Sequence, residues 1–383
     1  ELDWLQNMED WMISKKRYWG LALPIWECQK CGNFDVIGSE EELKFRAVEG
    51  WETFEGHTPH RPWIDAVKIT CSKCGAVVSR IQDVGNPWLD AGIVAYSTLE
   101  YRQDPEYWKS WFPADFICES LLGQFRNWFY SMLAMSTIME RLPPFRTCFG
   151  HGSVLAEDGR EMHKSWGNVI WFDDAAETMG ADVMRWIYCS SKPENDILFG
   201  YKLANEVKRQ FLIPLWNVYS FFVTYANLDK WKPNNATTQY SLLDRWILSK
   251  LQMLVQDVTN HLENYDAFGA TGSLQQFVDE LSTWYVRRSR RRFWKSEADV
   301  DKNAGYTTLY TCLTTLVKLL APFVPFVAEE MYQNLVRSVN PDALESVHHN
   351  DWPTAETSFI YKELMEEMDL AITISSLGRS ARS

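Results

Sequence analysis

The chain has 383 residues, of which 46% are hydrophobic and 14% aromatic, and its formal net charge is −13. The length suits a globular protein of two or three domains, while the acidic balance argues against nucleic-acid binding over the whole surface and leaves room for a local basic patch. No apolar run is long enough to span a membrane and no secretory leader opens the chain, so we expect a cytoplasmic protein. The first residues, ELDWLQNMEDW, look like the interior of a longer polypeptide, so we expect the sequence to be a fragment.

Basic residues precede an apolar, aromatic segment near the start of the chain. The polar and basic run SKKR over 14–17 is followed by YWGLALPIW over 18–26. An apolar run of this length predicts a strand. We interpret it as the edge of an α/β domain with basic residues at one end.

Two cysteine pairs with matching glycines lie between residues 27 and 85. Eight cysteines without a secretory signal indicate thiols or metal ligands rather than disulfides. Each CxxCG motif places two thiolates at the tip of a tight turn, and two such tips complete a tetrahedron. The pattern predicts a structural Zn²⁺ site at Cys28, Cys31, Cys71 and Cys74. His57 and His60 lie between the pairs and could replace a thiolate, but we expect surface or packing residues.

A carboxylate follows the next strand candidate. FPADFIC over 112–118 has strand character, Glu119 comes directly after it, and helical periodicity follows. Open α/β sheets bind ligands at the carboxyl ends of their strands. Glu119 could therefore hold a substrate ammonium group, or it could be an acid at a helix N-terminus, opposite the macrodipole. The residues alone leave both interpretations open.

A lysine lies in a glycine-containing loop over 157–168, EDGREMHKSWGN. Asp158 and Gly159 favour a turn, Lys164 offers a point charge with three donors, and Gly167 permits close backbone approach. The loop can be interpreted as a phosphate-handling segment. The spacing alone favours an exposed hairpin turn followed by a helix cap.

From residue 201 onward the pattern changes to long amphipathic stretches over 201–227, 242–264 and 271–294, with a polar break at 230–238. This periodicity predicts a helical bundle.

Within the predicted bundle, VRRSRRRFWK places five arginines on one helix: Arg287, Arg288, Arg290, Arg291 and Arg292. They could bind RNA phosphates while Trp284, Tyr285 or Phe293 pack or stack. Alternatively, they form a solvated helix face paired with carboxylates of the bundle. The sequence leaves both open.

Several segments resemble the class I aminoacyl-tRNA synthetases, most closely the isoleucyl-tRNA synthetases. EMHKS at 161–165 is similar to the family's KMSKS loop. DWMISKKRYWG resembles the family's DWxISRQRYWG. The segment around the five arginines, over 284–294, resembles the family's WYVRRSRRRFW almost letter for letter. In the lysine loop the matches are Met162, Lys164 and Ser165, and the departures are Glu161, His163 and Trp166.

Further matches concern substrate binding. ADFICESLLGQFRNWF resembles the family's ADLYLEGxDQxRGWF, with one extra residue between the glutamate and the glutamine. The matching residues there are Glu119, Gln124, Arg126 and Trp128. Trp88 matches the tryptophan of DVWFDSG, and His151-Gly152 resembles an HG pair that packs by the adenine.

The resemblance implies an α/β plus all-α chain: the second half of a Rossmann-like nucleotide-binding domain with a zinc-knuckle insertion, followed by a helical bundle. The implied regions are re-entry into the catalytic domain at 1–26, the zinc insertion at 27–85, the rest of the catalytic domain at 86–168, a connecting fold at 169–203 and an anticodon-binding domain at 204–383.

The activity implied by the resemblance is activation of isoleucine by ATP, with Mg²⁺, followed by transfer to tRNA. The family's HIGH signature does not occur in these residues, so we expect an N-terminal half of the same polypeptide to be needed. The implied catalytic residue is Lys164. The implied ATP or adenylate residues are Glu119, Gln124, His151, Gly152, Met162, Lys164 and Ser165. The implied amino-acid pocket is Trp88, Glu119 and Trp128, and the implied tRNA contacts are Arg287, Arg288, Arg291 and Arg292.

Two alternatives remain open at this stage. One is a non-catalytic RNA-binding relative whose lysine loop has diverged, which the altered EMHKS and ESLLGQ segments favour. The other is a synthetase of the valyl or leucyl type.

Overall fold

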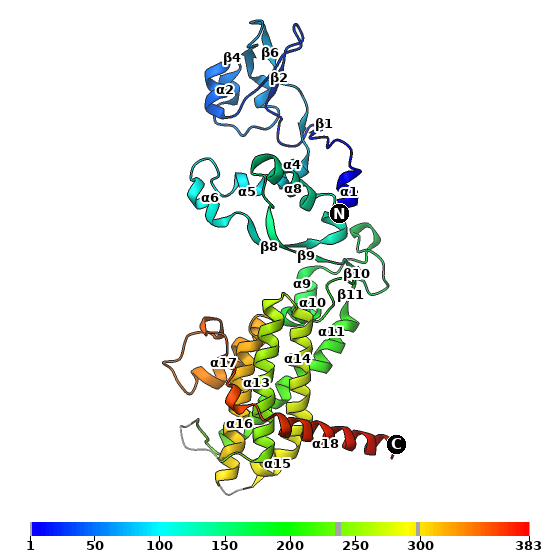
Figure 1. Ribbon diagram of the computed structural model, residues 1–383, viewed down its shortest axis with the longest axis vertical. Helices are drawn as coiled ribbons and strands as arrows, with labels where there is room; N and C mark the ends of the chain where they lie inside the picture. The colour runs from blue at the N-terminus through cyan, green and yellow to red at the C-terminus, as the bar shows by residue number, and fades with distance from the viewer. Residues whose placement is uncertain (1, 234–238, 296–298, 383) are drawn as a thin grey trace. The chain divides into compact units, whose positions relative to one another are not determined.

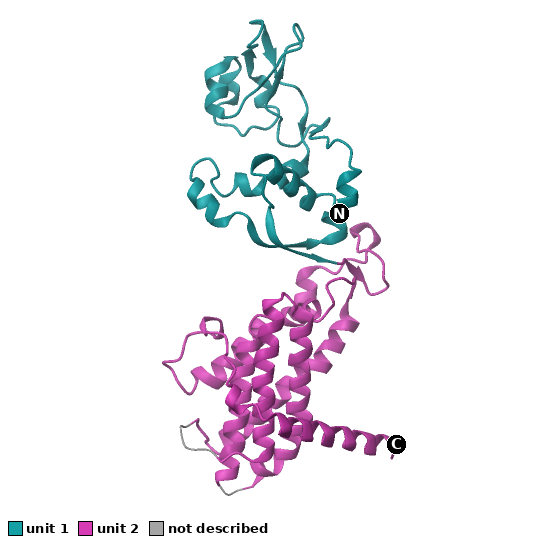
Figure 2. Ribbon diagram, viewed as in Figure 1, with its two compact units in different colours: residues 1–151 teal, residues 152–383 magenta. Residues whose placement is uncertain are grey.

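The computed structural model describes residues 2–233, 239–295 and 299–382 (Figure 1). The chain divides into two compact units, Glu1–His151 and Gly152–Ser383 (Figure 2). Most of the polar break expected at 230–238 falls on residues 234–238, outside the described residues.

The first unit contains a parallel strand pair with a helical crossover. β8 (Ala114–Ser120) pairs with β9 (Phe145–His151) from Ala114 opposite Phe145 to Ser120 opposite His151. The connection contains α7 (Leu121–Gln124) and α8 (Trp128–Met139), as parallel strands require a crossover. A small hydrophobic core between these strands and helices contains Ile117, Phe129 and Met132. Also in this region are α4 (Pro87–Gly92), α5 (Val94–Ser97) and α6 (Pro105–Trp111).

The predicted strand over 18–26 is mostly wrong. The structure has β1 (Ser14–Lys15), which pairs with β7 (Val84–Gly85), and β2 (Ile25–Glu27), with irregular backbone between them. Gly20 has a φ of +144°, and Pro24 lacks a backbone donor, so both interrupt the extended ladder. The remaining helix of this region is α1 (Leu2–Gln6).

The cysteine-containing insertion has its own small core. β2 pairs with β3 (Phe34–Val36), and a three-stranded sheet has the order β4-β5-β6. Trp26 and Val67 are fully buried there, and the Trp26 indole donates to the Val67 carbonyl at 3.0 Å. The other elements are α2 (Glu40–Arg46), β4 (Ala47–Glu49), α3 (Trp51–Phe54), η1 (Ile64–Ala66), β5 (Lys68–Thr70) and β6 (Val77–Ser79).

The second unit opens with a short parallel pair and the lysine loop. β10 (Val154–Ala156) pairs with β11 (Ile197–Phe199), and η2 (Lys164–Trp166) lies in the connection. Two helices, α9 (Phe172–Thr178) and α10 (Ala181–Cys189), lead into the bundle. The Asp182 carboxylate accepts the backbone N–H of Val327 at 2.7 Å and so ties α10 to the N-terminus of α17.

The predicted helical bundle is confirmed, with one continuous core (Figure 1). Helix covers 201–228, 242–263 and 267–294, close to the predicted stretches. Its largest fully buried side chains include Trp186, Trp246 and Tyr285. The elements are α11 (Tyr201–Val207), the π-helical turn η3 (Lys208–Leu212), α12 (Ile213–Leu228), α13 (Leu242–Glu263), α14 (Ala267–Glu280), the π-helical turn η4 (Leu281–Val286), α15 (Arg287–Trp294), α16 (Val300–Leu320), α17 (Pro325–Tyr332), η5 (Gln333–Arg337), η6 (Val347–His349), η7 (Thr357–Phe359) and α18 (Lys362–Ser380). No helix in the described ranges is both long and apolar enough to cross a membrane.

Candidate functional site

The structure brings the four predicted metal-ligating cysteines together. The ligand atoms of Cys28, Cys31, Cys71 and Cys74 all lie within 4.8 Å of one another. Each pair forms the same turn: the Gly32 N–H donates to the Cys28 carbonyl at 2.9 Å, and the Gly75 N–H donates to the Cys71 carbonyl at 3.0 Å. Both glycines adopt left-handed backbone, with φ of +68° and +73°, which explains why glycine follows each pair. Two such turns face each other with four sulfurs at their tips, as a tetrahedral thiolate site requires.

The thiols differ in how readily they lose a proton. Backbone N–H groups of Cys74 and Lys73 lower the pKa of the Cys71 thiol to about 6. The backbone of Asn33 lowers the pKa of Cys31, but burial and the neighbouring cysteine sulfurs outweigh it and raise this pKa to about 12. Four clustered sulfurs cannot all be ionised without a cation, so the donor set fits a soft divalent metal.

The two histidines between the knuckles do not join this cluster. The His57 ring stacks on Trp63, with 3.8 Å between centroids, and the His60 ring stacks on Trp19 at 5.8 Å. Their role as packing or surface residues agrees with the expectation from sequence.

Glu119 lies at the carboxyl end of β8, where the sequence placed it. Its Oε1 accepts the backbone N–H of Ser120 at 2.8 Å, and Ser120 lies opposite His151 in the strand pair. Glu119 and His151 therefore share the strand edge at which α/β sheets bind ligands. Gln124 ends α7, and its Oε1 accepts the Trp128 N–H at 3.3 Å, so it caps α8.

The two tryptophans of the expected amino-acid pocket lie on packed helices. Trp88 is in α4 and Trp128 begins α8. The Trp128 indole donates to the Ala91 carbonyl of α4 at 3.2 Å, and a Cβ on Gly92 would lie 2.7 Å from the Ser131 carbonyl oxygen. Both tryptophans are half-buried. The arrangement is compatible with a pocket wall and equally with helix packing.

The lysine loop is held by Asn168. Its side chain accepts the His163 N–H at 2.9 Å and donates to the Glu161 carbonyl at 2.8 Å. Gly159, predicted to lie in a turn, has a φ of +81°, and Gly167 has a φ of +68°, so both adopt left-handed backbone. These contacts fix the loop's shape without using its lysine.

Lys164 is exposed at the start of η2. Its Nζ lies 4.9 Å from the ring centroid of Trp171, and within the described ranges it has no carboxylate partner. The Glu161 carboxylate instead accepts from His163 Nε2 at 2.9 Å. An ammonium group without a carboxylate partner on an exposed loop is available to a phosphate. Met162 is half-buried and Ser165 is exposed beside it.

Gly152 has a structural reason to be glycine. Its N–H donates to the Pro193 carbonyl at 2.8 Å, and a Cβ at this position would lie 2.5 Å from the carbonyl oxygen of Asn195. The predicted adenylate residues are thus divided between the units. Glu119, Gln124 and His151 belong to the first, and Gly152, Met162, Lys164 and Ser165 belong to the second.

The arginines of α15 do not form one uniform surface. Arg287, Arg288, Arg290 and Arg291 are exposed. The Arg288 guanidinium lies 3.4 Å from the Trp284 ring centroid. Burial lowers the pKa of Arg288, and the positive charges of Arg287 and of Arg379 on α18 lower it further. Arg379 therefore adds charge to the same basic surface.

Arg292 points into the bundle, which contradicts its assignment as an RNA contact. Its Nη1 and Nη2 donate to the two carboxylate oxygens of Asp244 at 2.7 and 2.8 Å. Asp244 is fully buried and also accepts from the Tyr285 hydroxyl at 2.7 Å. The bidentate pair occupies the guanidinium fork that RNA recognition would need. No signal in the sequence separates Arg292 from its neighbours, because its partner lies 48 residues away.

Tyr285 and Phe293 beside the arginines pack inside the bundle, whereas Trp294 is exposed. Tyr285 is fully buried, and Phe293 is 2% exposed with its ring 4.9 Å from that of Tyr306. These two rings are therefore packing residues, while the Trp284 ring carries the Arg288 guanidinium.

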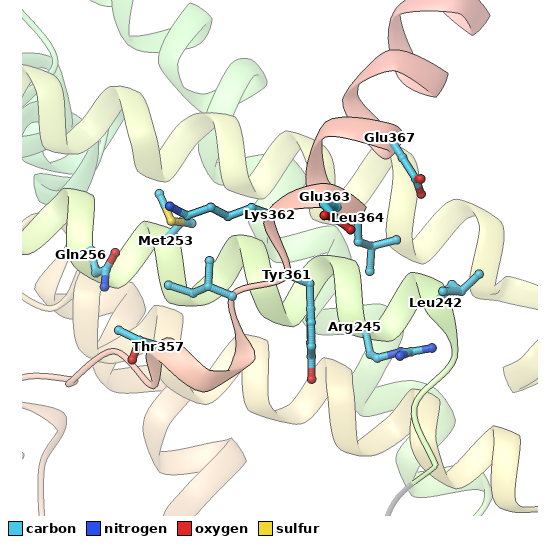
Figure 3. Close-up of a pocket in the computed structure, with 11 residues that line it drawn as sticks. Leu242, Arg245, Met253, Gln256, Thr357, Tyr361, Lys362, Glu363, Leu364 and Glu367 are labelled. Carbon is cyan, nitrogen blue, oxygen red and sulfur yellow. The ribbon is translucent and has the colours of Figure 1, made fainter.

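A groove of about 840 Å³ lies between α13 and the segment leading into α18 (Figure 3). Arg245 and Lys362 line it together with Glu363 and Glu367, so its formal charges cancel. Tyr361 and Arg245 both line this groove (Figure 3). The balanced charge does not match a phosphate-binding surface, and the groove contains none of the predicted site residues.

Comparison with known proteins identifies the relatives. Residues 2–200 match the family model for class I tRNA synthetases (I, L, M and V), and residues 244–383 match that for the anticodon-binding domain of tRNA ligases. The isoleucine–tRNA ligase of Dehalococcoides mccartyi is 48% identical over 100% of this chain and 38% of the relative. The isoleucine–tRNA ligase of Clostridium acetobutylicum is 45% identical over 99% of this chain and 36% of the relative. The protein of that name from Thermus thermophilus is 44% identical over 100% of this chain and 37% of the relative. The chain thus spans less than two fifths of the length of these relatives.

Solved structures share the fold. A ternary complex of LeuRS from Agrobacterium radiobacter K84 with tRNA and LeuAMS aligns with a TM-score of 0.66 at 19% identity, over 92% of this chain and 43% of that one. Methionyl-tRNA synthetase of Mycobacterium tuberculosis, in complex with methionyl-adenylate, aligns with a TM-score of 0.61 at 18% identity. This alignment covers 91% of this chain and 62% of that one. The Rossmann-like catalytic domain and the helical anticodon-binding domain expected from sequence are thereby confirmed. The chain belongs to the class I tRNA synthetases of the isoleucine, leucine, methionine and valine group.

Proposed function

We propose that the chain acts within a polypeptide of its relatives' length as part of an isoleucine–tRNA ligase. The observation that carries this proposal is the 40–48% identity to proteins of that name over at least 99% of the chain. The alignment runs through the lysine loop, the cysteine knuckles and the arginine helix, so it includes every region to which the sequence assigned chemistry. The domain division at residues 26, 85, 168 and 203 belongs to the same proposal.

The reaction has two steps. A carboxylate oxygen of isoleucine attacks the α-phosphorus of ATP, and the bond from that phosphorus to the bridging oxygen breaks to release pyrophosphate. A ribose hydroxyl of the tRNA then attacks the activated carbonyl and releases AMP. In the first step negative charge grows on the leaving pyrophosphate, so catalysis depends on positioning and on positive charge near the phosphates.

In this proposal Lys164 supplies that charge. Its ammonium group has no carboxylate partner within the described part of the chain, and it sits on an exposed loop whose shape is set by Asn168. Met162 and Ser165 flank it and would bind the same nucleotide. Mg²⁺ bound with ATP would share the phosphate charge.

The strand edge of the first unit would hold the amino acid and the adenylate. The Glu119 carboxylate would accept from the isoleucine ammonium group, and Trp88 with Trp128 would form apolar walls around its side chain. Gln124 and His151 lie on the two connected elements beside this edge and would bind the nucleotide. Gly152 would serve by leaving room for close packing after His151.

We further propose one structural Zn²⁺ at Cys28, Cys31, Cys71 and Cys74. Support comes from the four ligand atoms within 4.8 Å and from the repeated turn geometry. Bound zinc would stabilise the insertion by joining two segments that are 40 residues apart.

The tRNA would contact the exposed arginines of α15. Arg287, Arg288 and Arg291 lie on a surface to which Arg379 adds charge, in a chain with a net charge of −13. Such clusters bind phosphates through counterion release, which makes the affinity strongly dependent on salt. Arg292 does not take part in this contact, because its guanidinium group is bound to the Asp244 carboxylate.

The departures in the lysine loop favour a second candidate, a non-catalytic RNA-binding relative. Glu161 and His163 pair with each other there, and the glutamate would oppose phosphate binding. Pyrophosphate exchange separates the candidates when it is run with isoleucine, valine and leucine on the longer polypeptide. Exchange that is fastest with isoleucine supports the proposal. Absence of exchange with all three supports the RNA-binding relative, and preference for valine or leucine indicates the other synthetase types.

A further inference from the structure

The three residues by which this lysine loop departs from the family's loop, Glu161, His163 and Trp166, contact one another. The Nε2 atom of His163 lies 2.9 Å from Oε2 of Glu161. The His163 ring also meets the Trp166 ring edge to face, with 4.5 Å between centroids and 70° between planes. His163 therefore joins the acid to the aromatic residue, and the three departures form one connected group.

The backbone explains why the Glu161 and His163 side chains meet. His163 has extended backbone, with φ of −126° and ψ of 135°, and Glu161 forms an isolated bridge with Leu155. Side chains two residues apart on an extended chain point to the same face. Asn168 holds this segment through the Glu161 carbonyl at 2.8 Å and the His163 N–H at 2.9 Å. The acid and the imidazole are thus side by side, whereas Lys164 begins η2, where the backbone turns.

The other carboxylates of the loop are also bound by groups other than Lys164. Arg160 Nε donates to Oδ2 of Asp158 at 2.8 Å. The Lys202 N–H donates to Oε1 of Glu157 at 2.6 Å, which ties that side chain to the start of α11. Within the described part of the chain, neither of these acids is paired with Lys164.

Glu161 is the acid best placed to bind Lys164 if His163 is removed. The two residues are three positions apart, and both side chains are exposed. Exposed ion pairs are weak, so a second donor of similar strength decides which partner a carboxylate takes. A carboxylate bound to the ammonium group would cancel the positive charge that a phosphate needs.

We propose that His163 is a positioning residue that holds the Glu161 carboxylate away from the Lys164 ammonium group. The ammonium group then stays available to the phosphates of ATP, and Trp166 supports the imidazole ring that holds the acid. The inference rests on the proposed function for the role of Lys164. It explains the three departures from the family's loop as one compensated change, in which the histidine offsets the glutamate.

The first test is pyrophosphate exchange by the longer polypeptide. His163→Ala should slow exchange about two- to fivefold with little change in the KM for isoleucine, because Glu161 then competes for the ammonium group. Adding Glu161→Gln to His163→Ala should restore the wild-type rate, since no carboxylate remains at that position. His349→Ala is the matched control, because His349 is an exposed histidine of the same unit.

Acylation of lysines by a water-soluble ester measures the pairing without catalysis. An ammonium group bound to a carboxylate holds its proton more tightly and reacts more slowly. Mass spectrometry of the longer polypeptide should show Lys164 acylated about two- to fivefold more slowly in His163→Ala than in the wild type. The double variant should react at the wild-type rate, and the exposed Lys202 should react equally in all three proteins.

Equal acylation of Lys164 in the wild type and in His163→Ala would overturn the inference. Slowed exchange that Glu161→Gln does not restore would also overturn it, because the loss would then be structural. A wild-type polypeptide without exchange contradicts the proposed function, and the acylation rates still decide whether His163 keeps Glu161 from Lys164. Failure of the inference and failure of the proposed function are therefore observed separately.

Discussion

Arg288 and Arg292 belong to one arginine-rich helix, yet one guanidinium is exposed near Trp284 and the other is bound to a buried carboxylate. The position of Glu119 at the end of a strand, in contrast, could be predicted from the residues directly before it. Local patterns predict local placement, whereas a partner in a distant helix is set by packing.

Replacing Arg292 should destabilise the helical unit. Arg292→Gln leaves the Asp244 carboxylate buried without its cation, which costs about 3–5 kcal/mol. Urea unfolding measures this loss. Arg291→Gln is the control, with a change of less than about 0.5 kcal/mol expected for an exposed residue.

Variants of the exposed arginines test RNA binding separately from stability. Arg288→Gln with Arg291→Gln should weaken tRNA binding and flatten its salt dependence while the chain stays folded. If Arg292→Gln proved as stable as Arg291→Gln and lost tRNA affinity, the structural role of Arg292 would be refuted.

Asp244 should also make the helical unit sensitive to acid. Burial raises the pKa of Asp244, but hydrogen bonds from Arg292, Tyr285 and Ser241 outweigh burial and hold it below its usual value. A carboxyl whose folded pKa is depressed stabilises the fold above its unfolded pKa, which is about 3.9, and this stability is lost as the pH falls through the folded value. Between pH 6 and pH 3, unfolding free energy should therefore decline less steeply in Asp244→Asn than in the wild-type chain. Parallel declines in the two proteins would exclude this carboxylate as a source of the acid sensitivity.

Lys164 is predicted to act in the transition state rather than in substrate binding. Lys164→Ala in the longer polypeptide should slow pyrophosphate exchange on the order of 10²-fold or more, with little change in isoleucine affinity, because the charge it meets grows only as pyrophosphate leaves. Lys202→Ala is the control, since Lys202 is an exposed lysine of the same unit. Equal exchange by the Lys164 variant and the wild type would remove this lysine from the mechanism.

At the scale of elements, the knuckles and the long helices could be predicted and the short strands could not. Each CxxCG motif forms a tight turn within a few residues, and a helix of 22 residues such as α13 repeats its apolar spacing several times. The segment over 18–26 has strand composition, but Gly20 and Pro24 interrupt it, so that it forms only the short strand β2 and an isolated bridge between Ala22 and Val84. The stacked pairs of His57 and His60 depend on the fold of the insertion and have no local signal.

The cysteine knuckles should bind one metal ion per chain. Elemental analysis of the purified protein should give about one equivalent of zinc, and Cys71→Ser should lower that content and the thermal stability of the insertion. Cys118→Ser is the matched control, because Cys118 lies in β8 outside the cluster. A fully folded, metal-free wild-type chain would rule out the zinc assignment.

At the scale of the whole molecule, the family and both of its domain types could be recognised from sequence, because their motifs are spread over nearly the whole chain. The division of the predicted nucleotide residues between two units, at His151 and Gly152, could not be predicted, because motif spacing carries no information on where one compact unit ends.

We have proposed that this chain acts within a working isoleucine–tRNA ligase. The decisive measurement is charging of unfractionated tRNA with labelled isoleucine, valine or leucine by the longer polypeptide. We predict ATP-dependent attachment of isoleucine that exceeds attachment of the other two amino acids and is lost in Lys164→Ala. Charging by none of the three, from a folded protein that still binds tRNA, would contradict the claim.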